Sequence, residues 1–551
     1  MTLRHRVHRV LYVPLDDRPV NLSLPALLAG IVDYEMTTPP RELLGSYHTP
    51  GQPEAIVDWL LHQPVQQPDC LVLSLDMLLY GGLVASRMPA VSPEMARESL
   101  EALARLRQTF PEAQIYAFSI LTRLDFGLSE EDAQRYGDNL HRYVRLAGDR
   151  TRREEAGEIA RNLPKGLLET YTRVRQRNHE LSLAALDQVA AGNLDFLVLG
   201  QDDADCQGFH LSEQKALKTR LRKHKLTQRA TLYAGADEIG ALLFARFVHQ
   251  HMEETPKVAV LYLEPPEAEV APYEDRPFIE NLRLQAAAAG VELVDDQNEA
   301  DMILAVSPPA GNLSTALINS RQYAKRCQRL EKFAQQIAEL AERRGVAICD
   351  AAFPNGAEEA FMTALQAAGL PWPRLLSFAA WNTAGNSLGT ALAHGTVRLI
   401  GLRDKAAFDL AQLVTSISPM RYFELLNSLI GAEKAHLQLL LTRLADDWLY
   451  QTCVRTAVRE RMADLMTNSG FELTAAYGRA EGMVREMLVE AISNLWVEEF
   501  MGGRAGDIGP PEHRSGLTLA ELQDTQVRLP WRRLFEVELD FDLGLELTAT
   551  S

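Results

Sequence analysis

Residues 10–17 read Val10-Leu11-Tyr12-Val13-Pro14-Leu15-Asp16-Asp17, an apolar run that ends in two neighbouring carboxylates. Such a run predicts a buried parallel strand whose carboxyl end lies at the surface. The pattern recurs where Asp76 follows residues 71–75, where Asp202-Asp203-Ala204-Asp205 follows residues 196–200, and where Asp237-Glu238 follows residues 232–235. Ligands bind at the carboxyl ends of parallel strands in open α/β folds and in barrels, so we expect these acids to converge on one site.

The predicted strands fall into two blocks with one plan. The first block has strands near residues 10–15, 34–37, 70–75, 115–120, 196–200 and 232–234, with a helical insertion rich in Arg and Glu at 124–193. The second block has strands near residues 258–263, 291–294, 302–306, 346–350, 375–379 and 397–400. In each block a short second strand precedes an acidic residue that opens the third strand, a rhythm typical of flavodoxin-like sheets.

We therefore predict an α/β fold of two facing flavodoxin- or Rossmann-like parallel-sheet blocks, residues 1–255 and 256–404. A mainly helical region, residues 405–551, follows, with a Gly/Pro-rich linker at 502–511 and a final alternating strand at 534–543. The alternative is a (β/α)₈ barrel followed by the same helical region, since a barrel would also gather the polar turns at one mouth.

Composition excludes several classes of partner. The chain has 551 residues, a net charge of −18 and a pI near 5.3, which argues against nucleic acid and against an anionic membrane surface. No apolar run approaches the roughly 18 residues of a membrane span, and no signal-peptide core is present, so we expect a cytoplasmic protein. The five cysteines are scattered and have no zinc spacing. Oligomeric state is left open.

The turn after the first strand is rich in groups that can bind or transfer protons. Asp16 and Asp17 stand beside Arg18, which can pair with one carboxylate and depress its pKa while the other stays free. Asn21 adds an amide to the same turn. A salt-bridged loop that caps the next helix is the alternative interpretation.

The second turn combines Asp76 with an aromatic residue and a pair of glycines. Gly81-Gly82 permits a close approach of the backbone, and Tyr80 could stack on a sugar ring or donate a hydrogen bond. Arg87 ends the segment. The spacing of a phosphate-binding loop is absent.

The densest acidic cluster follows the fifth strand. Asp202 and Asp203 predict a general acid/base pair or carboxylate ligands for a hard divalent ion. In the metal interpretation the ligands would be Asp203, His210, Asp237 and Glu238, although a lone His is more often a core or helix-start residue. Adjacent acids at a strand-to-helix turn, such as Asp237 and Glu238, also suit a helix cap.

The second block supplies amides and an aromatic ring after its predicted strands. Asn355 lies in the turn at residues 350–357, and Trp381, Asn382 and Asn386 lie in a Gly-containing turn at a predicted helix start. Such a turn offers N–H groups to an anion, the amides could bind hydroxyls, and the indole could stack on a ligand. A Gly-rich turn capped by Asn is the alternative.

Five segments together resemble a bacterial family catalogued as domain of unknown function 4127. They are residues 12–21, 74–87, 201–203, 235–238 and 381–386, and the resemblance spans nearly the whole chain. It implies a bacterial protein and no particular activity. The chain departs from the family pattern at Ala204-Asp205-Cys206-Gln207, so the resemblance implies no role for Asp205 or Cys206.

Paired acids with Tyr, Trp, Asn and Arg near strand ends favour a hydrolase that acts on a carbohydrate or glycoside-like substrate by acid/base catalysis. The expected catalytic residues are Asp202, Asp203, Asp17, Asp76 and Asp237. The expected substrate-binding residues are Asp16, Arg18, Asn21, Tyr80, Arg87, Glu238, Asn355, Trp381, Asn382 and Asn386. The expected partner is a small molecule or an oligosaccharide. No cofactor is firmly implied; the alternatives are a divalent-metal sugar isomerase or hydrolase, and a non-catalytic two-lobed binder of a cationic small molecule.

Overall fold

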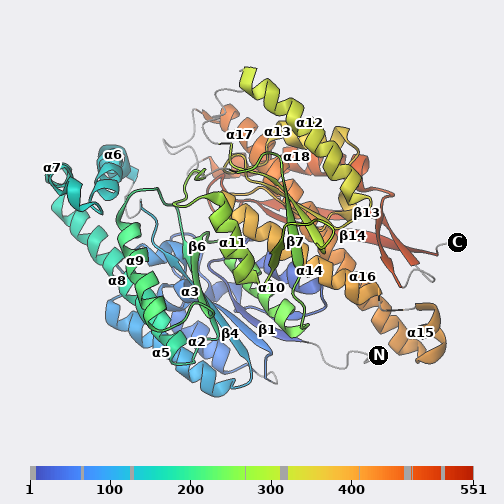
Figure 1. The fold of residues 1–551 in the computed structure, drawn as a ribbon, viewed down its shortest axis with the longest axis horizontal. Helices are drawn as coiled ribbons and strands as arrows, with labels where there is room; N and C mark the ends of the chain where they lie inside the picture. The colour runs from blue at the N-terminus through green and yellow to red at the C-terminus, as the bar shows by residue number, and fades with distance from the viewer. Residues whose placement is uncertain are drawn as a thin grey trace.

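The computed structural model describes residues 8–63, 67–124, 130–266, 269–310, 321–406, 408, 410–463, 473, 476–509 and 515–549. Two open parallel sheets with helices on their faces form the two α/β blocks, and a C-terminal helical region packs against them (Figure 1). Both sheets have free edge strands. The prediction of two parallel-sheet blocks is therefore confirmed, and the barrel alternative is wrong.

The first sheet has six parallel strands in the order β2-β1-β3-β4-β5-β6. Its chain order reverses between β1 and β3, which is the position where flavodoxin-like sheets bind ligands. All its strands except the short edge strand β2 are almost wholly buried, as expected for a sheet covered on both faces. Their bounds are β1 (Arg9–Val13), β2 (Glu35–Thr37), β3 (Cys70–Ser74), β4 (Gln114–Leu121), β5 (Phe196–Gln201) and β6 (Ala230–Ala234).

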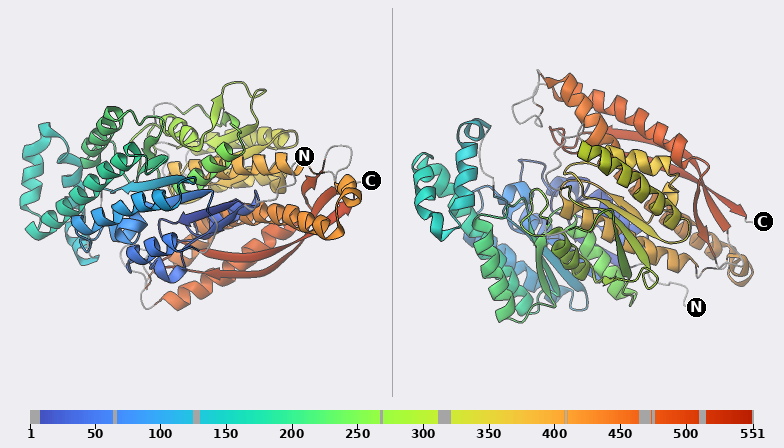
Figure 2. Two further views of the ribbon diagram at one scale, coloured as in Figure 1. Left: turned by 90° about the horizontal axis from the view of Figure 1, so that it is seen from below. Right: turned by 45° about the horizontal axis from the view of Figure 1, so that its top comes forward.

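Helices cover both faces of this sheet, and the insertion projects from one end of the molecule (Figure 2). The covering helices are α1 (Ser23–Gly30), α2 (Pro53–Leu61), α3 (Leu75–Tyr80), α4 (Leu83–Ser86), α5 (Pro93–Thr109), α9 (Phe209–Lys223) and α10 (Ile239–His251). The insertion consists of α6 (Glu130–Leu146), α7 (Arg153–Arg161) and α8 (Lys165–Ala190). It has a small core of its own that includes Leu140, Val144, Leu163 and Val174.

The second sheet has five parallel strands in the order β11-β10-β9-β7-β8, which is the flavodoxin-like arrangement once more. Its strands are β7 (Lys257–Tyr262), β8 (Glu292–Val294), β9 (Met302–Ser307), β10 (Val346–Asp350) and β11 (Ser377–Ala379). The helices between them are α11 (Phe278–Ala289), α12 (Arg321–Ala341) and α13 (Glu359–Ala367).

The strand predicted at residues 397–400 is wrong, because these residues lie inside helix α14 (Ala384–Ala406). This helix packs against α10 and α11 and against β10 and β11. From Ala384 to Gly401 every residue except Thr390 is buried. A helix buried on all sides has no polar face, so a short apolar segment of it cannot be told from a buried strand.

The C-terminal region is helical, as predicted, but it ends in a three-stranded antiparallel sheet rather than in one strand. The helices are α15 (Leu410–Ser416), α16 (Pro419–Arg443), α17 (Arg455–Arg461) and α18 (Tyr477–Leu495), with π-helical segments η5 (Leu444–Val454) and η7 (Trp496–Phe500). The strands are β12 (Arg504–Ile508), β13 (Ser515–Arg528) and β14 (Glu538–Ala549). Residues 529–537, which join β13 to β14, reach the first block.

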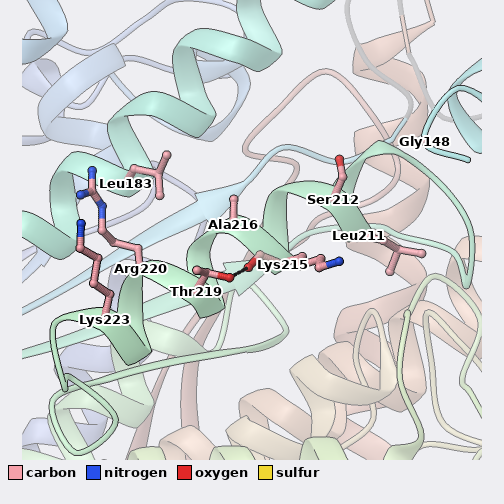
Figure 3. A pocket seen from close by; sticks show the side chains of 9 residues that line it. All are labelled: Gly148, Leu183, Leu211, Ser212, Lys215, Ala216, Thr219, Arg220 and Lys223. Carbon is pink, nitrogen blue, oxygen red and sulfur yellow. Dashed lines mark hydrogen bonds between the residues drawn. The ribbon is translucent and has the colours of Figure 1, made fainter. Parts of the chain in front are cut away.

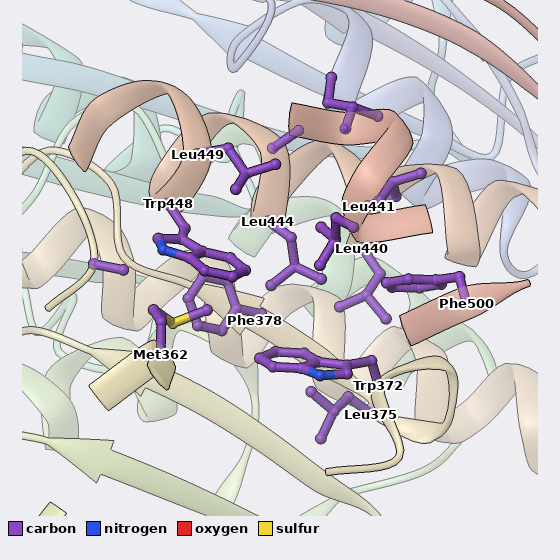
Figure 4. Close-up of a cluster of buried hydrophobic side chains, with 14 of the residues drawn as sticks. Met362, Trp372, Leu375, Phe378, Leu440, Leu441, Leu444, Trp448, Leu449 and Phe500 are labelled. Atoms are coloured by element: carbon purple, nitrogen blue, oxygen red, sulfur yellow. The ribbon is translucent and has the colours of Figure 1, made fainter. Parts of the chain in front are cut away.

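The second block and the C-terminal helices share one hydrophobic core (Figure 4). Trp372 and Phe378 of the block pack with Leu440, Leu444 and Trp448 of the helical region. Burying one large apolar side chain of this kind stabilises the folded protein by roughly 1.5–3 kcal/mol. The shared core therefore holds the C-terminal region against the second sheet. Within the described ranges, no helix has both the length and the apolar character needed to cross a membrane.

Candidate functional site

Arg18 lies at the centre of a buried polar cluster at the carboxyl ends of β1 and β6. Its guanidinium donates to Asp16 Oδ2 at 2.7 Å and to Asp237 Oδ1 at 2.5 Å. Only 4–5% of each of these three residues is exposed. Charge-assisted hydrogen bonds of this kind are stronger than hydrogen bonds between neutral groups. Burial alone would lower the pKa of Arg18, but the neighbouring carboxylates raise it.

Two amides complete this cluster and connect it to the second block. Asn21 donates to Asp16 Oδ1 at 2.8 Å and to Asp237 Oδ1 at 3.1 Å. Asn382, which follows β11, donates to Asp237 Oδ2 at 3.1 Å. Burial raises the pKa of Asp237 even though Arg18 opposes that shift. The turns after β1, β6 and β11 therefore meet at one carboxylate.

The turn that holds Asp237 depends on glycines at positions 235 and 385. Gly235 has φ +154°, and a Cβ there would collide with the Glu238 carboxyl group. A Cβ on Gly385 would collide with the Ala234 carbonyl oxygen, so the start of α14 can lie directly against the end of β6 only because residue 385 is glycine. Asn386 then accepts hydrogen bonds from the Asp237 and Ala236 amides, at 2.9 and 3.3 Å.

Asp202 and Asp203 form a second carboxylate cluster beside the first. Asp202 pairs with Arg87 at 2.5 Å, and Asp203 pairs with Arg123. Burial opposes the charged form of Asp202, but Arg87 and Arg123 hold its pKa below the usual range. Burial together with Asp202 and Asp237 raises the pKa of Asp203 to about 6, against the effect of Arg123. The two neighbours therefore differ in protonation near pH 6.

Asp76 lies at the start of α3 and interacts with Arg87 and Asp202 of this second cluster. Ser74 caps the helix by accepting a hydrogen bond from the Met77 amide at 3.2 Å, and Asp76 accepts one from the Ile120 amide at 2.7 Å. Asp76 is 1% exposed, and burial raises its pKa to about 7. Tyr80 is also buried, under the Arg177 guanidinium at 4.6 Å, so its ring contacts protein rather than a ligand.

Replacing Asp76 with Asn should stabilise the protein at pH 8 and leave its stability almost unchanged at pH 4. The folded state holds the Asp76 proton up to about pH 7, whereas the unfolded chain releases it near pH 4, so wild-type stability falls between these values as pH rises. Asn can still accept from the Ile120 amide, and it removes a penalty of at most about 4 kcal/mol. Urea unfolding at both pH values measures this. A variant that is equally destabilised at both would contradict the expectation.

The segment between β13 and β14 adds three side chains to the site. Trp531 donates its indole N–H to Asp17 Oδ1 at 2.8 Å. Burial raises the pKa of Asp17, and this hydrogen bond opposes the shift. Glu536 is 3% exposed, lies 3.7 Å from Arg18, and accepts from Arg533 Nε at 2.7 Å. Residues more than 500 positions apart in the chain thus form one buried network.

Three aromatic rings lie close to Arg533 in the segment between β13 and β14. Its guanidinium lies 4.6 Å from the Trp531 ring, 5.0 Å from Tyr47 and 5.3 Å from Phe535. Tyr47 and Trp531 are 4.8 Å apart, and Trp381 is 5.7 Å from Phe535. We call Tyr47, Trp381, Trp531 and Phe535 the aromatic wall. Tyr47 and Phe535 are partly exposed, whereas the two indoles are buried.

Trp531→Phe should destabilise the protein by about 1–2 kcal/mol more than Trp381→Phe, because only the first change removes a hydrogen bond to a carboxylate. Both indoles are 4% exposed, and among the described residues the Trp381 N–H has no hydrogen-bond partner. The second variant therefore controls for lost packing. Chemical denaturation at pH 7 measures the difference; equal costs would show that the Trp531–Asp17 bond contributes nothing.

The side chains proposed as metal ligands do not share one centre. His210 is fully buried on α9, with Asp275 at 3.7 Å. Glu238 turns back to accept from the Ala236 amide at 2.9 Å, and burial raises its pKa strongly. Within the part of the chain that the structure describes, no three His, Cys, Asp or Glu side chains are grouped so that they could hold a metal ion.

The sequence model of one protein family matches residues 10–540, nearly the whole chain, and that family is described as a protein of unknown function, DUF4127. The chain belongs to the DUF4127 family. The predicted resemblance is thereby confirmed, whereas a comparison with curated proteins finds no match. All the segments that meet at Arg18, from Asp16 to Glu536, lie inside the matched range of this DUF4127 chain.

Asn355 is connected to the Arg18 cluster through Asn382. Asn355 has φ +64°. Its backbone N–H donates to the backbone carbonyl of Asn382 at 2.8 Å, and its backbone carbonyl accepts from the Arg455 side chain at 3.0 Å. Asn382 itself has φ +65°, a conformation that asparagine tolerates better than most residues. Asn355 therefore supports the backbone that presents Asn382.

Sequence reasoning missed several members of the site in this DUF4127 protein. They are Tyr47, Arg123, Trp531, Arg533 and Glu536. The available signal was Trp531 beside Arg532 and Arg533, directly before the final predicted strand, because exposed loops seldom need a tryptophan. Nothing in the local pattern around Tyr47 or Arg123 distinguishes them from ordinary loop residues.

Proposed function

We propose that this protein is a hydrolase that acts on a carbohydrate or glycoside-like substrate by acid/base catalysis with carboxylates. The observation that supports this most strongly is Asp203, whose side chain is 25% exposed and whose pKa is raised to about 6 beside an ionised neighbour. Two carboxylates with pKa values pushed apart are the arrangement by which proteins make an acid and a base from one residue type.

In this proposal Asp203 transfers the proton. Near pH 6 it is close to its midpoint, where a group can both give and accept a proton efficiently. Asp202 stays ionised through Arg87, so it can stabilise positive charge that develops on a sugar ring in the transition state. Asp17, whose pKa is raised by burial, lies at the aromatic wall, where it accepts a hydrogen bond from Trp531.

The remaining groups suit a ligand with many hydroxyls. Asn382 is partly exposed and already fixed by Asp237, and the Arg18 cluster holds the turns around it rigidly. The aromatic wall has two partly exposed rings, and sugar rings stack on such faces. Preorganised amides and carboxylates orient hydroxyls without further ordering of side chains.

The metal enzyme and the cationic-ligand binder remain predictions that the same experiment addresses. A panel of chromogenic glycosides is assayed between pH 4 and 8 with the purified protein, with and without EDTA, and with elemental analysis of the preparation. The proposal expects turnover of at least one glycoside. EDTA should leave this turnover unchanged, and Asp203→Asn should reduce it by about 100-fold or more. Turnover lost with EDTA would favour the metal enzyme. Saturable binding of a polyamine without any turnover would favour the binder.

A further inference from the structure

Helix α9 and the turn after it are strongly basic in an otherwise acidic chain. Residues 209–225 contain six Lys and Arg residues and a single acid, Glu213, whereas the whole chain has a net charge of −18. Glu213 does not offset these cations, because it pairs with Arg175 of α8 at 2.7 Å. The basic side chains therefore produce a local positive field on this side of the first block.

Helix stability explains only part of this charge. Arg220, Arg222 and Lys223 lie in the last turn of α9, where cations interact favourably with the helix dipole. Lys215 and Lys218 lie one or two turns earlier, beyond the reach of that effect. Lys218 interacts with the carboxylates of Asp275 and Glu280, whereas Lys215 is exposed and borders a groove between α8 and α9.

The basic side chains border a groove of about 920 Å³ between α8 and α9 (Figure 3). Arg220 and Lys223 lie with Leu183 at one end, Leu211 and Ser212 lie near Gly148 at the other, and Lys215 stands between them. The lining residues are Gly148, Leu183, Leu211, Ser212, Lys215, Ala216, Thr219, Arg220 and Lys223.

The groove combines apolar contacts with cations. Leu211 is 40% exposed and lies at one end of the groove (Figure 3). Leu183 and Ala216 add further apolar surface, while Lys215 and Lys223 are exposed. Arg220 keeps one partner, Asp187, at 3.4 Å. A partner that fits this surface needs apolar side chains for the groove and acidic side chains for its rim.

We propose that the groove between α8 and α9 binds an acidic peptide segment of a protein partner, with leucine-like side chains against Leu183 and Leu211 and carboxylates facing Lys215, Arg220 and Lys223. A peptide fits better than nucleic acid because the chain as a whole repels a long polyanion, whereas a short segment carries few charges. The site is separate from the carboxylate clusters and does not depend on the proposed hydrolase activity.

The test uses a fluorescein-labelled synthetic 15-residue peptide of Glu, Leu and Ala with leucines at helical spacing. Its binding to the full-length protein is followed by fluorescence anisotropy at low and high salt. A second peptide with Gln in place of Glu controls for apolar binding, and a 15-nucleotide oligodeoxythymidine controls for general attraction of anions.

Two charge-reversed variants separate the groove from the general charge of α9. Lys215→Glu/Lys223→Glu changes the groove, and Arg222→Glu/Lys225→Glu changes the same net charge at positions outside its lining. We expect salt-sensitive binding of the Glu peptide that the first variant weakens by about tenfold or more and the second by less than about threefold. Equal weakening in both variants, absence of saturable binding, or tighter binding of the oligonucleotide would overturn the proposal. Self-association of the wild type that only the first variant abolishes would overturn it in favour of a second copy of the chain.

Discussion

Arg18→Met should destabilise the protein by about 3–5 kcal/mol, the usual cost of removing one partner from a buried ion pair. The change leaves Asp16 and Asp237 buried without their cation, and both are no more than 5% exposed. Equilibrium urea unfolding at pH 7 measures the loss. Binding of any substrate should fall with it, because Arg18 joins the turn after β1 to Asp237 after β6, and Asp237 in turn accepts from Asn382 after β11.

A second substitution distinguishes the loss of charge balance from the loss of packing. In Arg18→Met/Asp237→Asn, one of the two stranded carboxylates becomes neutral, so the double variant should be more stable than Arg18→Met alone. Arg326→Met is a matched control, since Arg326 is buried and pairs with one carboxylate, Glu358, at 2.8 Å. Arg18→Met should cost more than this control. A loss below about 1 kcal/mol would contradict the central position of Arg18.

Asp203→Asn should reduce kcat by about 10²- to 10⁴-fold on any glycoside that the wild type hydrolyses, because the amide cannot transfer a proton. KM should change little, since Asn keeps the size of the side chain. The wild-type rate should depend on a group with a pKa near 6, and this limb of the pH profile should be absent from the residual rate of the variant.

Asp205→Asn is the matched control for this change. Asp205 lies in the same loop, is exposed to a similar extent, 27% against 25% for Asp203, and also pairs with an arginine, Arg145, at 3.3 Å. We expect its kcat to stay within about threefold of wild type, as for most substitutions of paired surface groups. Equal losses in both variants would show that the loop, rather than the Asp203 carboxyl, controls the rate.

The strand pattern of both α/β blocks was predictable because buried parallel strands are continuous apolar runs that end in polar turns. The eleven parallel strands match eleven of the predicted segments to within a few residues. The exception, residues 397–400, belongs to α14, whose burial on all sides removes the helical periodicity that would have revealed it.

The antiparallel C-terminal sheet was less visible in the sequence. β13 alternates buried and exposed residues only in part, and the register shifts between Leu519 and Glu521 and again between Gln523 and Gln526 interrupt the period of two. β12 lies where glycines and prolines predicted a linker. The formation of both strands depends on pairing with strands that are distant in the sequence, and the local pattern does not encode this pairing.

The candidate site likewise contains residues that the local sequence pattern predicted and residues that it did not. Side chains that end strands, such as Asp16, Asp237 and Asn382, could be named because parallel strands bring their carboxyl ends together. Trp531 and Glu536 could not, since their contacts with Asp17 and Arg18 come from the path of the chain between β13 and β14. The burial of Asp76 and Tyr80 likewise follows from packing of α3 against its neighbours and not from the turn that contains them.

The most direct test of Asp203 as the proton-transfer group is a carbon-13 NMR titration of the aspartate carboxyls, which needs no substrate. The wild type should show a carboxyl with a midpoint near pH 6 that is absent from Asp203→Asn and present in Asp205→Asn; Asp76, with a pKa near 7, is assigned with Asp76→Asn. If the signal lost in Asp203→Asn instead titrates near pH 4 with the exposed aspartates, Asp203 is an ordinary surface acid and the proposed chemistry is wrong.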